Sequence, residues 1–222
     1  MKNLKILALI PARMGSSRFP GKPMKKIKAK PMIHHVYERV NKNKLLTKTY
    51  VATCDTEISN YLKKNNFNYM MTSKKHERAS DRCAEALKKI EKIEKKKFDI
   101  IVMVQGDEPM VNPQMITESL SPFFKNKNNT HVVNLLGKFE SKKEFLDKNC
   151  IKVLCDDRMN AKYFTRNLPL KFYNQSNKLL GKQVCIIPFS RSMLFKYIKL
   201  MPTFFEIKES VDMWRLLENS LE

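Results

Sequence analysis

Apolar runs of strand length alternate with segments of helical periodicity through the first half of the chain. The predicted strands are residues 4–10, 49–53, 67–71 and 98–104. The predicted helices are residues 31–41, 56–65 and 80–96, the last capped by Ser80. Strands that alternate with helices pair in parallel through right-handed crossovers, so this half predicts a parallel sheet with helices on its faces.

The second half is less regular and richer in strands. The predicted strands here are residues 131–136, 150–154, 162–165 and 183–188, and the predicted helices are 113–124, 191–200 and 206–219. Asn, Gln, Ser and Gly residues make 171–182 the best candidate for a flexible loop. The whole pattern predicts an α/β fold with a doubly wound, mostly parallel mixed sheet and a small antiparallel lobe near its edge.

The composition fits one large domain. The chain has 222 residues, of which 42% are hydrophobic, enough for a substantial core. No apolar run approaches the roughly 20 residues that cross a bilayer, and residues 4–10 lead into a polar loop rather than a secretory cleavage site. Five cysteines are scattered without a C-x-x-C pair, so buried reduced thiols are expected. We expect a cytoplasmic protein without a membrane partner.

The formal net charge of +21 raises the question of nucleic-acid binding. Most of the excess is lysine dispersed over predicted helix faces, such as Lys88, Lys89 and Lys92, without interleaved aromatic residues. A solvated lysine surface is therefore expected, and no nucleic-acid partner. The same charge would attract an acidic small molecule, with a strong dependence on salt.

Residues 10–23 carry the densest candidate chemistry. Gly15 and the two serines after it follow a predicted strand, where they can expose backbone N–H groups and hydroxyls. Arg13, Arg18 and Lys22 can donate charge-assisted hydrogen bonds to phosphate oxygens. The spacing of the two glycines, and the proline after the lysine, exclude a Walker A loop. The segment predicts a triphosphate-binding loop, and a surface turn with incidental charge is the alternative.

A second polar segment, residues 105–109, follows the strand at 98–104 and reads Gln-Gly-Asp-Glu-Pro. Ligands of open α/β sheets bind outside the carboxyl ends of the strands. Strands 4–10 and 98–104 would therefore present cations and a carboxylate at one edge. Asp107 can bind Mg²⁺, which prefers oxygen ligands and substrate phosphates, although Asp after Gly is also common in turns.

These segments resemble the signature of the 3-deoxy-manno-octulosonate (Kdo) cytidylyltransferase family, the CMP-Kdo synthetases. The resemblance rests on Pro-Ala-Arg, Gly-Ser, Arg and Pro-Gly-Lys-Pro within residues 10–23 and on Gln-Gly-Asp-Glu-Pro at 105–109. Residues 76–82 match a stretch of His, two residues, Gly, Thr or Ser, an acid and Arg. The resemblance implies a nucleotide-diphospho-sugar transferase-like fold in one domain, 1–222, with a nucleotide-binding half at 1–125 and a sugar-binding and dimerisation half at 126–222.

The resemblance also implies a reaction and its residues. CMP passes from CTP to Kdo or a related acidic 2-keto sugar with release of pyrophosphate, Mg²⁺ is the cofactor, and the protein is a homodimer serving lipopolysaccharide or surface polysaccharide synthesis. The implied catalytic residues are Arg13, Lys22 and Asp107, with Asp107 as the metal ligand. The implied nucleotide-binding residues are Pro11, Ala12, Arg13, Gly15, Ser16, Arg18, Lys22, His76, Ser80 and Arg82. The implied sugar-binding residues are Gln105, Arg166, Gln183, Glu206 and Glu209.

Several of these residues also have ordinary structural interpretations. Taken alone, His76 suits a turn or a helix cap, and Arg166 suits a solvated position at a strand end. Glu206 and Glu209 share a predicted helix with Arg215, where intrahelical ion pairs on a solvated face are expected.

The chain departs from the family pattern at several places. Arg78 adds a cation and Ala79 replaces Gly, a mild change unless that position needs a positive φ. Gln183 and Cys185 replace the His and Gly of a His-x-Gly-x-Tyr stretch. No string like Val-Asp-Thr-Pro-Glu-Asp, which holds the family's second metal ligand, occurs in the sequence, so residues 126–222 are expected to lack that C-terminal segment.

These departures leave two alternatives open. One is the same reaction on a different, sialic-type sugar acid. The other is a non-catalytic, basic nucleic-acid-binding protein that retains this fold.

Overall fold

A five-stranded sheet organises the first of two structural units. The computed structural model describes residues 4–15, 19–125, 130–174 and 177–221. The first unit comprises residues 1–133 and 185–198, and the second comprises 134–184 and 199–222. The predicted halves at 1–125 and 126–222 differ from these units, because residues 185–198 return to the first unit.

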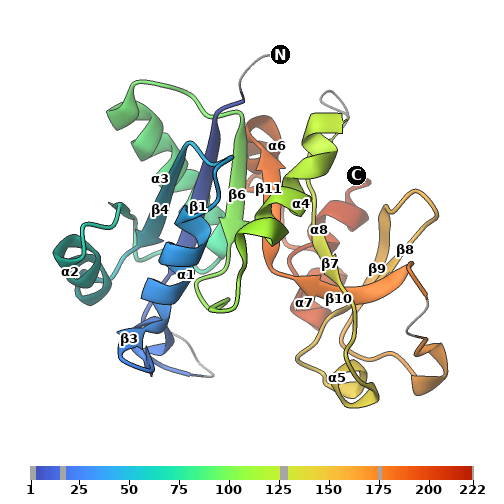
Figure 1. Ribbon diagram of the computed structural model, residues 1–222. Helices are drawn as coiled ribbons and strands as arrows, with labels where there is room; N and C mark the ends of the chain where they lie inside the picture. Colours follow the sequence, from blue (N-terminus) through green and yellow to red (C-terminus); the bar gives the residue numbers. More distant parts are fainter. Residues whose placement is uncertain (1–3, 16–18, 126–129, 175–176, 222) are drawn as a thin grey trace. The chain divides into compact units, whose positions relative to one another are not determined.

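The strands of the first unit lie in the order β11–β6–β1–β4–β5, and only β11 runs antiparallel to its neighbour (Figure 1). They are β1 (Ile6–Ala12), β4 (Lys48–Thr53), β5 (Tyr69–Met71), β6 (Ile100–Val104) and β11 (Ile186–Ser190). A separate hairpin pairs β2 (Lys26–Ile27) with β3 (Lys30–Pro31) after the short 3-10 helix η1 (Lys22–Met24).

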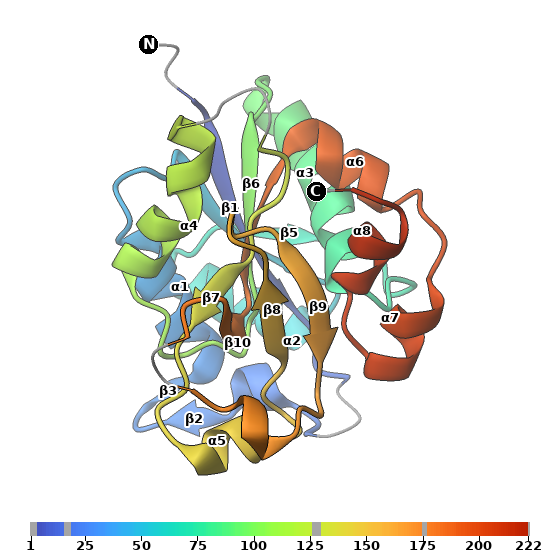
Figure 2. The ribbon, with the colours of Figure 1, turned by 90° about the vertical axis from the view of Figure 1, so that its right-hand side faces the viewer.

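Helices cover both faces of this sheet, as Figure 2 shows edge-on. On one face lie α1 (Met32–Asn41) and α4 (Pro113–Lys125), and on the other lie α3 (Ala79–Glu94) and α6 (Arg191–Tyr197). The helix α2 (Thr56–Lys64) packs beside β5 at the sheet edge. The predicted doubly wound, mostly parallel mixed sheet is confirmed.

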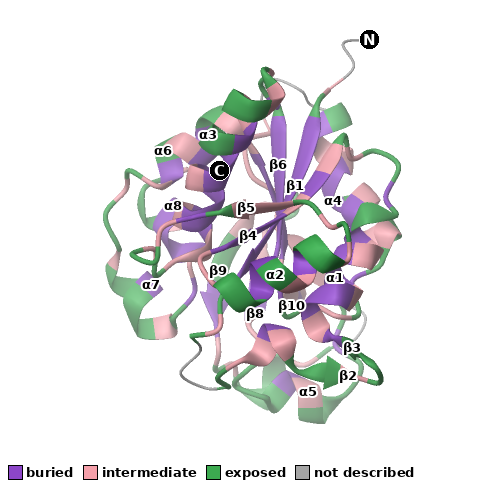
Figure 3. Cartoon of the chain, turned by 90° about the vertical axis from the view of Figure 1, so that its left-hand side faces the viewer, coloured by how far each residue is buried: buried purple, intermediate pink, exposed green. Residues whose placement is uncertain are grey.

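The central strands are buried on both faces. Every residue of β1 and of β6 is buried (Figure 3), and both strands are almost wholly apolar. Unbroken apolar runs are typical of strands with helices on both sides, because neither face of the pleat meets water. This burial fixes the ends of β1 and β6, from which the candidate site is built.

The second unit contains a four-stranded antiparallel sheet in the order β7–β10–β8–β9. Its strands are β7 (Leu135–Gly137), β8 (Lys152–Cys155), β9 (Ala161–Thr165) and β10 (Leu180–Val184). Its helices are α5 (Lys142–Leu146), the 3-10 helix η2 (Leu170–Phe172), α7 (Phe204–Glu209) and α8 (Trp214–Glu218). The expected antiparallel lobe is thus present.

The prediction of one strand over 183–188 is wrong. The chain leaves β10 at Val184 and enters β11 at Ile186, so the two strands belong to different sheets. Both segments favour extended backbone, and a local pattern does not reveal which sheet a strand joins. The predicted strand at 131–136 is likewise shorter, since Val132 makes only an isolated bridge to Phe189 before β7 begins.

The prediction of a flexible loop over 171–182 is also wrong at its end. Gly181 lies inside β10 and pairs with Val153 of β8. A Cβ at Gly181 would lie 2.6 Å from the carbonyl oxygen of Gly137, so glycine is needed here for the close approach of two strands.

The predicted helix at 206–219 is two helices. The chain leaves α7 at Ser210, which has left-handed backbone with φ 51°, and α8 begins at Trp214. Arg166 stabilises this break, because its Nε donates to the carbonyl of Glu209 at 2.7 Å and its Nη2 donates to that of Ser210 at 3.1 Å. The guanidinium therefore satisfies carbonyls at the carboxyl end of α7.

The expected ion pair on a solvated face is instead a buried pair between the two helices. Both Glu206 and Arg215 are 2% exposed, and the guanidinium contacts the two carboxylate oxygens at 2.8 and 2.7 Å. Glu206 also forms a capping box with Thr203 at the start of α7. The pair connects α7 to α8.

The cysteines are partly as expected. Cys83 is fully buried, and burial raises the pKa of its thiol. The other four are free thiols of intermediate exposure rather than buried ones.

We predict that Glu206→Ala lowers the free energy of unfolding by about 3–5 kcal/mol, because the buried Arg215 charge loses its carboxylate. Urea unfolding followed by circular dichroism measures this. Glu118→Ala, which removes a carboxylate from an exposed hydrogen bond on α4, is the matched control and should change stability by less than about 0.5 kcal/mol. Equal stability of the two variants would contradict a structural role for the pair.

Candidate active site

The site begins where two neighbouring strands end. β1 and β6 pair in parallel, with Leu9 opposite Met103. Arg13 follows β1 and Gln105 follows β6, so both emerge at the carboxyl edge of the sheet. The expectation that strands 4–10 and 98–104 present their polar residues at one edge is confirmed.

The two loops touch through Gly106. A Cβ at this position would lie 2.8 Å from the carbonyl oxygen of Pro11, closer than real Cβ contacts allow. Glycine therefore lets the chain after β6 pass directly against the chain after β1. This contact sets the separation of the two polar loops.

Lys22 and Asp107 meet across this edge. The Lys22 Nζ lies 2.7 Å from an Asp107 carboxylate oxygen, and the two side chains are 33% and 47% exposed. An ion pair as exposed as this contributes at most about 1 kcal/mol. Both groups are therefore able to exchange their mutual contact for a charged ligand at little cost.

Lys22 owes its position to the turn before it. Gly21 has left-handed backbone with φ 71° and precedes η1, and its N–H donates to the carbonyl of Met14 at 2.9 Å. The N–H of Met14 donates to the Asp55 carboxylate at 2.8 Å. Met14 is thus held from both sides, which closes the loop at its base.

Asp55 is a residue that the sequence reasoning missed. It follows β4, the neighbour of β1, at the same carboxyl edge. The position directly after a predicted strand is the signal that points to it. Of the loop residues predicted to bind nucleotide, Gly15 is exposed, whereas Ser16 and Arg18 lie outside the described residues.

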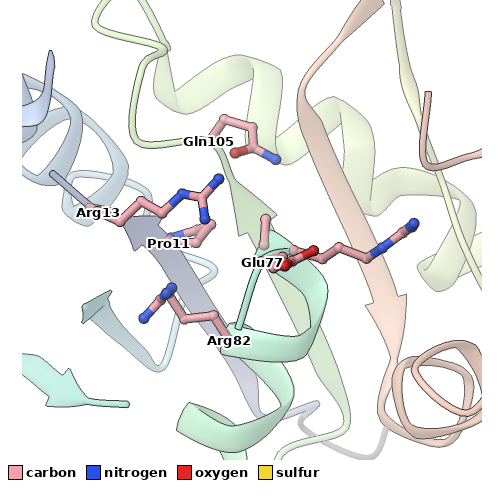
Figure 4. Close-up of a pocket in the computed structure, with 8 residues that line it drawn as sticks. Pro11, Arg13, Glu77, Arg82 and Gln105 are labelled. Atoms are coloured by element: carbon pink, nitrogen blue, oxygen red, sulfur yellow. The ribbon is translucent and has the colours of Figure 1, made fainter. Parts of the chain in front are cut away.

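A cavity of about 200 Å³ opens beside this loop. Figure 4 shows Arg13 and Gln105, which directly follow β1 and β6, and Arg82, which comes from α3, around this cavity. In the part of the chain that the structure describes, its lining residues are Pro11, Ala12, Arg13, Glu77, Arg78, Ala79, Arg82 and Gln105. The described lining holds three arginines against one carboxylate, so its net charge is positive and favours an anionic ligand.

The start of α3, which forms one wall of the cavity, differs from the prediction. The helix starts at Ala79 with Arg78 as its N-cap, so Ser80 lies within the first turn and does not cap it. The Ser80 side chain is 1% exposed. Ala79 is helical, so this position needs no positive φ and the replacement of Gly is tolerated.

His76 lies next to this wall but outside the cavity lining. Its Nε2 contacts a carboxylate oxygen of Glu85 on α3. Partial burial raises the pKa of the Glu85 carboxyl, but hydrogen bonds from Lys89, the Ser73 N–H and His76 outweigh it and bring the pKa to about 2. A nucleotide contact by His76 stays a prediction.

Glu108 is the second carboxyl beside Asp107. Burial raises its pKa, and the neighbouring Asp107 charge adds to the increase, while the Cys185 N–H and the Lys22 charge act against both. The net pKa is above the usual range of a glutamate. Asp107, by contrast, presents an exposed carboxylate.

The residues predicted to bind sugar are divided between the units. Gln105 lies in the first unit, and Arg166, Gln183, Glu206 and Glu209 lie in the second. Gln183 donates to the Asn134 side chain at 2.7 Å. The Glu209 carboxylate accepts from the Arg166 N–H at 2.9 Å. With the Glu206–Arg215 pair, these contacts give the four residues structural roles, and sugar contacts by them stay predictions.

Among the described residues, no three His, Cys, Asp or Glu side chains gather into a ready-made metal site. The exposed carboxylate of Asp107 suits Mg²⁺, which is typically held by one or two carboxylates together with substrate phosphates and water, and its role as a metal ligand stays a prediction. No described helix is long and apolar enough to cross a bilayer.

Comparison with known proteins shows the family of this chain. The family model for cytidylyltransferases matches residues 7–222. The 3-deoxy-manno-octulosonate cytidylyltransferase of Trichlorobacter lovleyi is 36% identical over 98% of this chain and 88% of its own length. The protein of the same name from Fusobacterium nucleatum is 34% identical over 97% of this chain and 85% of its own length.

Two solved structures are similar to this chain as well. A CMP:2-keto-3-deoxy-manno-octonic acid synthetase complexed with CTP matches with a TM-score of 0.84 and 32% identity, over 98% of this chain and 87% of that one. A cytidylyltransferase from Leptospira borgpetersenii, at 19% identity and a TM-score of 0.63 over 98% of this chain and 72% of that one, shares the fold.

The matched family model and the full-length relatives place the chain among the nucleotidyltransferases, and a doubly wound sheet with an arginine-lined cavity at its carboxyl edge is compatible with that class. The chain belongs to the cytidylyltransferase family, and the relatives that cover nearly all of it are named 3-deoxy-manno-octulosonate cytidylyltransferases.

We predict that Gly106→Ala lowers the free energy of unfolding by about 1–3 kcal/mol, because its Cβ would overlap the Pro11 carbonyl. Gly15→Ala is the matched control for stability, since a Cβ there meets no atom within 4 Å. Thermal and urea unfolding of both variants test this. A Gly106→Ala protein as stable as Gly15→Ala would show that the two loops are not held in contact.

Proposed function

We propose that this protein transfers CMP from CTP to Kdo, or to a closely related acidic 2-keto sugar, with release of pyrophosphate. The names of the full-length relatives and the CTP complex of the similar solved structure support this proposal. In a bacterium, the product would serve lipopolysaccharide or surface polysaccharide synthesis.

One observation carries the proposal. The Lys22–Asp107 pair, with its 2.7 Å contact, stands at the sheet edge to which Arg13 also belongs. Transfer of a nucleotidyl group from a nucleoside triphosphate needs cations that bind the phosphates and a carboxylate that binds the accompanying divalent ion.

The cations of the first loop would bind the triphosphate. Arg13 is exposed and lines the cavity, so its guanidinium is able to reach a phosphate there. Lys22 would exchange its contact with Asp107 for a phosphate oxygen. Positive charge placed where pyrophosphate leaves stabilises the charge that builds up in the transition state.

Asp107 is the residue that would hold Mg²⁺. A bound Mg²⁺ supplies Lewis-acid stabilisation of phosphate oxygens. The exposed carboxylate of Asp107 suits an ion that takes its remaining ligands from the substrate and water.

The transfer itself needs no covalent enzyme intermediate. The oxygen of the sugar's anomeric hydroxyl forms a bond to the α-phosphorus of CTP, and the bond from that phosphorus to the bridging oxygen breaks. Pyrophosphate leaves with that electron pair, and the hydroxyl proton passes to water. The residues of this chain contribute by orienting the two substrates and by neutralising charge.

The remaining expectations belong to the same proposal. Contacts between the sugar and Gln105, Arg166 or Gln183 stay predictions, and so do the homodimer and the cytoplasmic location. The departure at Gln183 from the family's His makes the identity of the sugar acid the first question for experiment.

We predict pyrophosphate release when the protein is given CTP, Mg²⁺ and Kdo, and none when the sugar is left out. A coupled phosphate assay over a panel of sugar acids and of the four nucleoside triphosphates measures this. Turnover with a sialic-type acid but none with Kdo would overturn the choice of sugar. Absence of turnover, together with nucleic-acid binding that persists at physiological salt, would favour the basic nucleic-acid-binding alternative.

We predict that Asp107→Asn and Lys22→Ala have different kinetic effects. Asp107→Asn should lower kcat about 100- to 1,000-fold and make the reaction rate depend less on the Mg²⁺ concentration. Lys22→Ala should raise KM for CTP about 10- to 100-fold, because one charge-assisted hydrogen bond is lost. Both side chains are partly exposed, so the midpoint of urea unfolding should stay near that of the wild type. Full activity of Asp107→Asn would contradict its assignment as the metal ligand.

A further inference from the structure

Glu85 lies on α3, one turn after Arg82, and contacts the segment that precedes the helix. One of its carboxylate oxygens accepts from the Ser73 N–H at 2.9 Å and contacts His76 Nε2. The other lies 2.7 Å from Lys89 Nζ on α3 itself. A single carboxylate therefore connects residues 73 and 76 to the helix.

Arg82 donates side-chain hydrogen bonds to backbone carbonyls of the same segment. Its side chain is 2% exposed and donates to Thr72 Oγ1 at 2.6 Å, to the Ser73 carbonyl at 3.4 Å and to the His76 carbonyl at 3.1 Å. Ser73 and His76 are thus each held twice, once by the carboxylate and once by the guanidinium.

The segment held in this way leads directly into the cavity wall. Glu77 and Arg78 follow His76 and line the cavity, and Figure 4 shows Glu77 beside the opening with Arg82 beneath it. The cavity lining does not include Glu85. Its carboxylate therefore acts on the wall through the backbone of Ser73 and the side chain of His76.

We infer that Glu85 is a positioning residue for nucleotide binding, which fixes residues 73–78 so that Glu77 and Arg78 stand correctly at the cavity. This inference rests on the proposed function, because it takes CTP as the ligand of the cavity. It assigns Glu85 a role in the affinity for CTP and none in binding the sugar.

Hydrogen bonds from neighbouring groups keep the Glu85 carboxylate ionised. Lys89 on α3 and His76 on the segment before the helix contact this carboxylate. Their hydrogen bonds and that of the Ser73 N–H lower the Glu85 pKa to about 2, against the increase from burial. The carboxylate is therefore ionised from neutral pH down to strongly acidic pH. Its contacts with Ser73 and His76 do not act as a pH switch in this range.

The test compares Glu85→Ala and Glu85→Gln with the wild-type chain. Glu85→Ala should raise KM for CTP about tenfold, the equivalent of one lost hydrogen bond to a charged group, with KM for the sugar within about twofold of the wild type. Glu85→Gln keeps an oxygen that can accept from the Ser73 N–H, so it should restore most of the affinity. Hydrogen exchange at the amides of residues 73–78 should be faster in Glu85→Ala and near normal in Glu85→Gln.

Glu91 provides the matched control on the same helix. Its carboxylate also accepts a backbone N–H, from Phe98 at 3.0 Å, and pairs with Arg191 at 2.8 Å, but it holds no residue of the cavity wall. Glu91→Ala should lose stability while leaving KM for CTP unchanged. An equal increase in KM for CTP in both alanine variants would overturn the inference, because general destabilisation would then explain it.

The outcomes separate this inference from the proposed function. An active wild type with unchanged KM for CTP in Glu85→Ala would overturn the role of Glu85 alone. A wild type without CTP turnover would overturn the proposed function. In that case the dissociation constant for CTP, measured by calorimetry, replaces KM, and a value equal in wild type and Glu85→Ala, or the absence of CTP binding, would overturn the inference as well.

Discussion

The parallel pairing of β1 with β6 is the constraint on which the first unit's site depends. Both strands are buried along their whole length, so their ends are fixed by the packing of the core. Gly106 then lets the chain after β6 lie against the carbonyl of Pro11. Lys22 and Asp107 meet at this edge, and Arg13 follows β1 at the same edge, because two apolar strands are in register. The chemistry of the site thus follows from hydrophobic burial some residues earlier in the chain.

The exposure of the charges at this edge supports their proposed role in binding a ligand. A partly exposed pair such as Lys22–Asp107 adds little to the free energy of unfolding. The buried Glu206–Arg215 pair is the opposite case, because each charge depends on its partner and the pair connects two helices. The difference in exposure therefore separates the pair that we propose to bind substrate from the pair that connects two helices. Most of the cations behind the net charge of +21 lie outside the described cavity lining, so the overall charge says little about the cavity.

The sequence predicted those features whose causes are local. The apolar runs of β1 and β6 indicate buried strands, and the polar segments after them indicate one sheet edge, so Arg13 and Asp107 could be placed from the pattern alone. The break at Ser210 could not be predicted, because Arg166, more than forty residues earlier, satisfies the carbonyls there. The division between β10 and β11 was missed for the same reason. Extended backbone is a local property, whereas membership of a sheet depends on distant strands.

The cavity wall shows how a departure from a family pattern is accommodated. Ala79 replaces the family's Gly, yet it is the first residue of α3 and has ordinary helical backbone. The conformation of the preceding segment does not depend on glycine here, because Arg82 and Glu85 hold Ser73 and His76 from the helix. Side-chain hydrogen bonds can fix a loop whose own backbone is unstrained. Arg78 and Ala79 thus stand between a segment held by side-chain hydrogen bonds and a helix with ordinary backbone, so the replacement of the family's Gly requires no unusual backbone in the cavity wall.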